Sequence, residues 1–313
     1  MDGVLLGFSI VAVLVGVGVL TAAVAPEASI TMQKGVTPLV YYITNPCLMV
    51  TLVAETDVRS VAGVYAPLAL GIALIAGGAF VVFALLARRS AADTAVGAMS
   101  SSYVNAGNIG VPVALYIVGS TGPVVAVLLA QLLVLAPAYL TVFGLIAGRS
   151  SVSAGRGVAM RTIVSSVLNP TTLGVLVGAL LSLFLWRPPE PLWEPLRMLG
   201  EASIPLLLLI YGMALWKERP FTVRERLPDS LVALACKGAV MPLAAWVLGG
   251  PVLGLEGADL LGVVAMAALP TAQNVYLFGL QHGMPATVTK DVIFGSSFLA
   301  LPVTLLAAWL IAV

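Results

Sequence analysis

Apolar stretches of about 20 residues follow one another along almost the whole chain, separated by short polar connections. A helix of about 20 apolar residues spans the hydrocarbon of a bilayer, and a helix satisfies its own backbone polar groups there. Hydrophobic residues make up 60% of the 313 residues and charged residues 9%, whereas soluble domains carry about 25% charged residues. The sequence therefore predicts an all-α integral membrane protein with no soluble domain between its spans.

Charged residues and clusters of proline and glycine divide the chain into ten predicted transmembrane helices. These lie near residues 3–24, 36–54, 61–87, 94–118, 123–147, 162–185, 196–216, 230–249, 259–281 and 286–312. A hydrophilic segment at 148–161, rich in serine and glycine, separates a first half (1–150) from a second half (151–313). Each half is predicted to be a repeat of five helices.

The second repeat is predicted to be inverted relative to the first. Lys and Arg concentrate in the cytoplasmic connections of membrane proteins, and with the amino terminus outside most basic residues of this chain fall in inner connections. Ten helices then place both termini on the outer side of the cytoplasmic membrane, and five helices per half invert the second half. Landmarks recur in the same order in both halves, Pro46 with Pro205 and Asn108 with Asn274, which supports the repeat.

The fourth and ninth predicted helices are each interrupted by a polar, helix-breaking run. Residues 105–112 read NAGNIGVP and residues 270–274 read PTAQN. A polar break inside a membrane span persists only where it lines a cavity or is buried in protein, and two breaks at matched positions are typical of a transporter with a midplane site. We expect both helices to split at their breaks and the broken ends to meet. The predicted helix breakers are Gly107, Gly110, Pro112 and Pro270.

Polar side chains in and near the breaks are the candidate substrate-binding residues. They are Asn105, Asn108, Thr271, Gln273 and Asn274, together with Asn45 and Lys237. A half-helix that begins after a break presents free N–H groups and a positive dipole end, which suits a carboxylate. The alternative is that the amides only satisfy carbonyls freed by a kink and bind nothing.

Two of these candidates carry open alternatives. Asn45 either faces the site or supports a kink at Pro46. Lys237 lies well inside a predicted helix, where a lysine is costly. It either pairs with an anionic substrate, ties down the broken helix, or extends its ammonium group to the inner interface.

Several classes of function find no support in the sequence. A net charge of +1 offers no basic face for nucleic acid, no Walker A run indicates an ATP-driven pump, and no nucleophile–base or paired-acid group indicates an enzyme. The two cysteines, Cys47 and Cys236, both fall in apolar spans, so neither a disulfide nor a metal site is expected. No cofactor is expected.

Acidic residues cluster near the ends of the predicted helices. They include Glu55, Asp57, Asp93, Glu201 and Asp259. We therefore expect no deeply buried carboxylate of the kind that proton or sodium relays use. Coupling to Na⁺ through backbone carbonyls, or to H⁺, is left open.

The two interrupted runs and Lys237, a few residues before Pro242, make the chain resemble the auxin efflux carrier family of membrane transporters over its whole length. That family belongs to a larger group with the bile acid:sodium symporters. The resemblance implies two inverted five-helix repeats with broken, crossing helices 4 and 9. It also implies elevator-type scaffold and transport domains, each assembled from both halves. The long central loop of the plant carriers is absent, and bacterial relatives point to malonate or malate more than to auxin.

The sequence as a whole predicts a secondary transporter that moves mono- or dicarboxylates across the cytoplasmic membrane by alternating access. A sodium-coupled symporter of larger organic anions is one alternative and an anion channel is another. The expected partners are the small carboxylate, the lipid bilayer and, as an option, a second copy of the chain in a homodimer.

Overall fold

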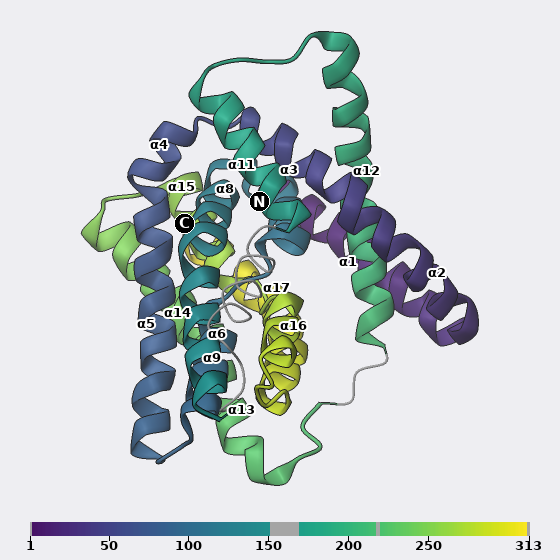
Figure 1. Ribbon diagram of the computed structural model, residues 1–313. Coiled ribbons are helices and arrows are strands. Elements are labelled where there is room, and N and C mark those ends of the chain that lie inside the picture. The colour runs from purple at the N-terminus through teal and green to yellow at the C-terminus, as the bar shows by residue number, and fades with distance from the viewer. Residues whose placement is uncertain (1, 151–168, 217–219, 312–313) are drawn as a thin grey trace. The chain divides into compact units, whose positions relative to one another are not determined.

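The computed structural model describes residues 2–150, 169–216 and 220–311. These residues form helices joined by short connections, with no named strand among them (Figure 1). Six helices are long and apolar enough to cross a membrane, and they cover Pro26–Ala54, Val58–Leu86, Gly122–Ala147, Glu190–Leu215, Arg224–Val252 and Thr287–Ile311. Shorter apolar helices accompany them. The all-α membrane architecture is confirmed, while ten crossings and an inverted repeat remain predictions.

The chain forms two compact units, and each unit takes segments from both halves of the sequence. Unit 1 comprises Met1–Tyr65, Gly107–Leu128 and Asn169–Glu218, and unit 2 comprises Ala66–Ala106, Leu129–Leu168 and Arg219–Val313. The boundary therefore passes between Ala106 and Gly107, inside the first interrupted run. The predicted halves 1–150 and 151–313 meet at the edge of residues 151–168, which lie outside the described residues.

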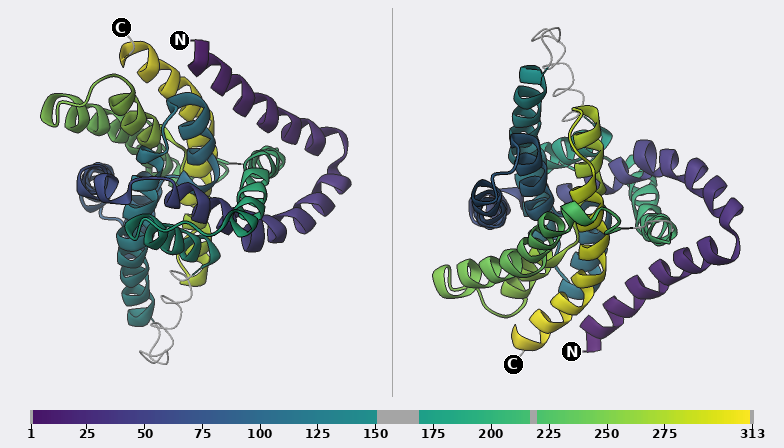
Figure 2. Two further views of the ribbon diagram at one scale, coloured as in Figure 1. Left: turned by 90° about the horizontal axis from the view of Figure 1, so that it is seen from above. Right: turned by 90° about the horizontal axis from the view of Figure 1, so that it is seen from below.

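Unit 1 holds the amino-terminal helices and the pair that follows the central segment. Its elements are α1 (Asp2–Val24), α2 (Pro26–Leu39), η1 (Val40–Thr44), α3 (Asn45–Ala54), α4 (Val58–Gly63), most of η2 (Ala106–Gly110), α7 (Val111–Val113), η3 (Ala114–Val118), most of α8 (Gly122–Ala130), α11 (Pro170–Leu183) and α12 (Glu190–Leu215). Helices α1 and α2 diverge from a turn at Ala25, as both views in Figure 2 show. Asn169 caps α11 by accepting a hydrogen bond from the Thr172 amide at 3.0 Å.

Glycine allows the helices of unit 1 to pack closely. A Cβ added at Gly18 in α1 would overlap the carbonyl oxygen of Leu209 in α12, and a Cβ at Gly212 would overlap that of Val15. Small residues at such crossings let two membrane helices approach until their backbones touch. Helices α1 and α12 therefore form a closely packed pair.

Unit 2 contains the long carboxy-terminal helix and the helices around it. Its elements are α5 (Tyr65–Leu86), α6 (Ala91–Ser102), η4 (Gln131–Leu135), α9 (Ala136–Ser150), η5 (Arg224–Arg226), α13 (Leu227–Ala235), η6 (Cys236–Val240), α14 (Met241–Val247), η7 (Leu248–Val252), α15 (Gly257–Ala268), α16 (Gln273–Gln281) and α17 (Thr287–Ile311). Helix α17 packs on α6, α13 and α15. The buried side chains of Phe80, Ala98, Ala233 and Val292 bring α5, α6, α13 and α17 into one apolar core.

Four prolines follow directly on a π-helical turn. Pro46, Pro112, Pro137 and Pro242 are each the second residue of the α-helix that begins after η1, η2, η4 and η6. Proline cannot donate to the helical ladder and its ring collides with the carbonyl one turn earlier. A π turn shifts the bonding from i→i+4 to i→i+5 and so relieves this conflict inside a continuous helix.

Candidate functional site

Two interrupted helices meet in unit 2 through the backbones of their breaks. Helix α6 ends at Ser102, residues Tyr103–Asn105 are extended, and α15 is separated from α16 by residues 269–272. The Asn105 amide donates to the Pro270 carbonyl at 2.8 Å, and the Ala272 amide donates to the Tyr103 carbonyl at 3.2 Å. Val104 and Thr271 are thereby paired as an antiparallel bridge. Each break supplies hydrogen-bond partners that the other lost by leaving the helix.

The first break lies nearer the amino terminus than the sequence predicted. Gly107, Gly110 and Pro112 are in the helix that resumes at Ala106 and continues to Val118. Pro112 does not break that helix because the π turn Ala106–Gly110 precedes it.

The second break matches its predicted breaker. Pro270 lies at the break, and Leu269 before it is extended with φ −54° and ψ 149°. A residue that precedes proline prefers this conformation, so the sequence locally ends α15 at this point.

Gln131 in η4 was not among the predicted site residues, yet it holds the centre of the first break. Its Oε1 accepts a hydrogen bond from the Val104 amide at 2.6 Å, and its Nε2 donates to the Val104 carbonyl at 3.1 Å. The amide side chain therefore takes the place of a neighbouring strand for one residue. A polar residue alone in the apolar run 123–137 was the available signal.

Thr271 serves as an anchor of the second break. Its hydroxyl donates to the Ser100 carbonyl in α6 at 2.6 Å, and its amide donates to the Ser296 hydroxyl in α17 at 3.0 Å. Both donors of this buried residue are used within unit 2. Thr271 thus fixes the break to two helices.

Lys237 ties down the end of α15. Its side chain is buried, with 1% of its surface exposed, and Nζ donates to the Ala267 carbonyl at 2.7 Å and to the Met241 sulfur at 3.3 Å. The carboxyl end of a helix carries a partial negative charge, which a cation stabilises. The contact is that of a tie to the broken helix, and the ammonium group is not extended to an interface.

The remaining amides are distributed between buried and open positions. Asn105 is buried, and within the described part of the chain its Nδ2 has no hydrogen-bond partner. Gln273 is half-buried and Asn274 is exposed, in the first turn of α16, whose N-cap residue Ala272 supplies no side-chain hydrogen bond. This helix start places the amides of Gln273 and Asn274 beside two polar side chains, the chemistry that binds carboxylates.

Asn108 and Asn45 belong to unit 1. Asn108 is half-buried in η2. Asn45 is buried at the start of α3, where Nδ2 donates to the Thr171 hydroxyl of α11 at 3.0 Å, and its Oδ1 has no partner among the described residues. Asn45 therefore contributes at least in part to the contact between α3 and α11.

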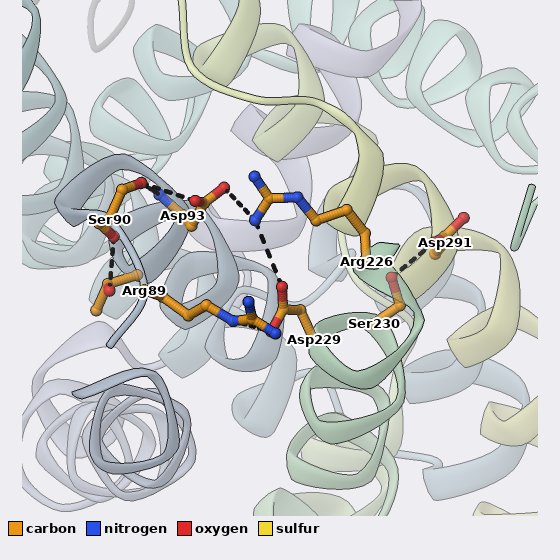
Figure 3. A network of polar contacts seen from close by, with 8 residues as sticks. Arg89, Ser90, Asp93, Arg226, Asp229, Ser230 and Asp291 are labelled. Carbon is orange, nitrogen blue, oxygen red and sulfur yellow. Dashed lines mark hydrogen bonds and ion pairs between the residues drawn. The ribbon is translucent and has the colours of Figure 1, made fainter. Parts of the chain in front are cut away.

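Two carboxylates are buried in unit 2, contrary to the expectation that the chain has no deeply buried carboxylate. Asp229 is 1% exposed, and it pairs with Arg89 at 2.8 Å and Arg226 at 3.5 Å (Figure 3). Arg226 also pairs with Asp93 at 2.9 Å. The two arginines balance the two aspartates, which is why the start of α13 can bury a charge.

Asp291 in α17 is the second buried carboxylate. One oxygen accepts from the Ser230 hydroxyl at 2.6 Å (Figure 3), and the other accepts from the Phe221 amide at 2.7 Å. The sequence did not predict that Asp291 is buried, because its partners Phe221 and Ser230 come from a distant segment of the chain. Among the described residues no cluster of three or more metal-ligating His, Cys, Asp or Glu side chains occurs.

Comparison with known proteins also indicates a membrane transporter. A family model described as "Membrane transport protein" matches residues 9–307. The "Putative malonate transporter" of Rhizobium meliloti (strain 1021) is 28% identical over 269 residues, which cover 78% of this chain and 76% of that protein. "Auxin efflux carrier component 3a" of Oryza sativa subsp. japonica is 28% identical over 153 residues, 45% of this chain and 23% of the rice protein.

These matches identify the chain as a multi-pass membrane transporter and not an enzyme. They also confirm the family that was predicted from the two interrupted helices. The chain belongs to the membrane transport protein family, which is that of the auxin efflux carriers.

Proposed function

We propose that the protein is a secondary transporter of small mono- or dicarboxylates that works by alternating access. The observation that carries the proposal is the pair of breaks bonded to each other in unit 2, beside a helix start without a side-chain cap. The name of the Rhizobium relative supports a dicarboxylate such as malonate. A carboxylate at this position would receive hydrogen bonds from the first amides of α16 and from the Gln273 and Asn274 side chains.

The first interrupted helix would complete the site. Asn105 contributes a buried amide whose Nδ2 has no hydrogen-bond partner among the described residues, and Asn108 is retained as a candidate from the sequence prediction. The start of a helix carries a partial positive charge, which favours an anion over a cation. The ammonium group of Lys237 adds positive charge to the same region of unit 2. Lys237 acts in this account through α15, which it holds in place, and not by contact with the substrate.

Transport is proposed to proceed without sodium at the breaks. Unwound carbonyls often coordinate Na⁺ in transporters, but here the carbonyls of Tyr103, Val104 and Pro270 already accept hydrogen bonds from Ala272, Gln131 and Asn105. Proton coupling would instead require a buried acid such as Asp291. No cofactor forms part of the proposal.

The proposal retains the wider architecture predicted from the sequence. It places ten helices in the cytoplasmic membrane as two inverted repeats, with both termini outside and with a homodimer as an option. The two compact units, each drawn from both halves of the chain, support a division into a scaffold and an elevator-type transport domain. Unit 2, which holds the bonded breaks, is the candidate transport domain.

A thermal-shift screen tests substrate and coupling together. Purified protein is heated with a series of mono- and dicarboxylates and with matched organic cations, each in sodium and in potassium salt. A carboxylate that binds the folded state raises the melting temperature, and the stabilisation grows with the logarithm of its concentration relative to its Kd. We expect dicarboxylates to stabilise equally in both salts. Stabilisation by cations alone would contradict the proposed substrate class, and stabilisation only in sodium would contradict sodium-independent binding.

A further inference from the structure

A cavity of about 300 Å³ lies in unit 1 where α3 and α11 end, and the proposed transport function does not use it. Its lining includes Glu55, Arg187, Trp186 and Trp193. The volume is at the lower end of the roughly 300–1,000 Å³ typical of ligand sites. The cavity is therefore suited to a small polar group.

The floor of this cavity is held in place by hydrogen bonds. The Ser182 hydroxyl at the end of α11 donates to the Thr56 carbonyl at 2.6 Å and accepts from the Val58 amide at 3.2 Å. The Asp57 side chain caps α4 by accepting from the amides of Arg59 and Ser60. The segment between α3 and α4 is thus fixed to α11, so the cavity is preformed.

The charged side chains in the cavity are only weakly engaged with each other. Arg187 and Glu55 are 3.7 Å apart and their side chains are 59% and 45% exposed. Arg187 also lies over the ring of Trp193, with Cζ 5.4 Å from the ring centroid. An exposed ion pair at this distance contributes little to stability, so a ligand with both charges could engage each partner at small cost.

The balance of charge selects the kind of ligand. Among the residues that line the cavity, Arg187 supplies a guanidinium group and Glu55 and Asp57 supply two carboxylates, of which Glu55 lies 3.7 Å from Arg187. A purely anionic group would meet net negative charge, and a purely cationic group would leave Arg187 unused. A zwitterion satisfies both signs, with its anionic group on Arg187 and its ammonium group on Glu55.

Large apolar side chains lie exposed beside the cavity. Phe184, Leu185 and Trp186 follow the end of α11, and all three are exposed, Leu185 to 91%. Leu185 has a φ of 51°, a left-handed conformation at a helix end that glycine usually occupies. Leu185 is therefore exposed at the end of an apolar helix. Its neighbour Trp186 is of a residue type that is enriched at the membrane interface.

We propose that this cavity binds the headgroup of a zwitterionic phospholipid. The phosphate lies on Arg187, the ammonium group lies at Glu55 beside the tryptophan rings, and the acyl chains lie along Phe184, Leu185 and Trp186. Cation–π contact and a charge-assisted hydrogen bond are the interactions that this chemistry requires.

Native mass spectrometry of the purified protein in detergent tests the assignment. The protein is titrated with phosphatidylethanolamine or phosphatidylglycerol of identical acyl chains, and bound lipids are counted. We expect one phosphatidylethanolamine bound about tenfold more tightly than phosphatidylglycerol, since one charge-assisted hydrogen bond distinguishes the two. Equal binding of the two lipids would overturn the proposal, and this comparison needs no variant.

A matched pair of double variants locates the site. Arg187→Gln with Glu55→Gln should lower phosphatidylethanolamine binding about tenfold, whereas Lys34→Gln with Glu27→Gln, which removes one cation and one anion from exposed positions of α2 that do not line the cavity, should leave it unchanged. Equal binding by the two double variants would overturn the assignment. Soluble glycerophosphoethanolamine should not compete at concentrations equal to the lipid; full competition would assign the cavity to a soluble ligand instead.

Discussion

At the scale of single residues, the breaks are held by side chains that replace missing backbone partners. Gln131 serves both polar groups of Val104, Thr271 reaches the Ser100 carbonyl, and Lys237 reaches the Ala267 carbonyl. A buried backbone group without a hydrogen-bond partner lowers the free energy of unfolding by on the order of a few kcal/mol. Each of these side chains should therefore matter for stability in proportion to the backbone groups that it satisfies.

Gln131→Leu should lower the free energy of unfolding by about 1–3 kcal/mol, because it leaves the Val104 amide without its partner, while the Val104 carbonyl still accepts a hydrogen bond from the Ala106 amide at 2.9 Å. The measurement is the melting temperature in detergent. Gln33→Leu is the control, since the side chain of Gln33 in α2 donates to the Ser29 hydroxyl one turn earlier and to no backbone group among the described residues. A melting temperature for Gln131→Leu as high as that of the control would show that Gln131 does not hold the break.

Lys237→Met should lower stability by about 1–3 kcal/mol, because methionine fills the volume and offers no donor to the Ala267 carbonyl. Lys34→Met, at an exposed position in α2, is the control and should change the melting temperature little. Substrate affinity of the folded Lys237→Met protein, measured by thermal shift, should stay near that of the wild type. A large loss of affinity with unchanged stability would instead place the ammonium group on the substrate.

At the scale of helices, close crossings depend on glycine at some positions and not at others. Gly18 and Gly16 lie two residues apart in α1, but a Cβ at Gly18 would overlap the Leu209 carbonyl, whereas a Cβ at Gly16 meets nothing within 4 Å. Gly18→Ala should therefore cost about 1–3 kcal/mol through overpacking, and Gly16→Ala should gain about 0.5–1 kcal/mol through helix propensity. Thermal unfolding of both variants checks the contrast, which equal changes would contradict.

At the scale of the whole molecule, the sequence specified the helices better than the contacts between them. Apolar run lengths were sufficient for an all-α membrane protein, and Pro270 marked the second break because proline acts locally. The first break is at Tyr103–Asn105 and not at Pro112, since Gln131 and the second break pair with it from distant positions. The burial of Asp291 likewise depends on Phe221 and Ser230 from another segment.

Unit 2 is proposed to move as one body, and a cross-link inside it should therefore leave transport intact. The hydroxyl oxygens of Ser100 in α6 and Thr289 in α17 are 3.1 Å apart. Ser100→Cys with Thr289→Cys, in a background where Cys47 and Cys236 are alanine, should form a disulfide without loss of uptake. Uptake that is lost on oxidation and restored by reduction would show that α6 and α17 move relative to each other during transport.

The central claim is that a carboxylate crosses the membrane at the two breaks, and uptake by proteoliposomes tests it most directly. The probe is radiolabelled malonate, or the carboxylate that stabilises the protein most in the thermal-shift screen. Wild-type protein and the control Gln33→Ala should accumulate it down an imposed gradient, while folded Asn108→Ala and Asn274→Ala proteins should fall to the level of empty liposomes. Uptake at the wild-type rate in both asparagine variants would contradict the account.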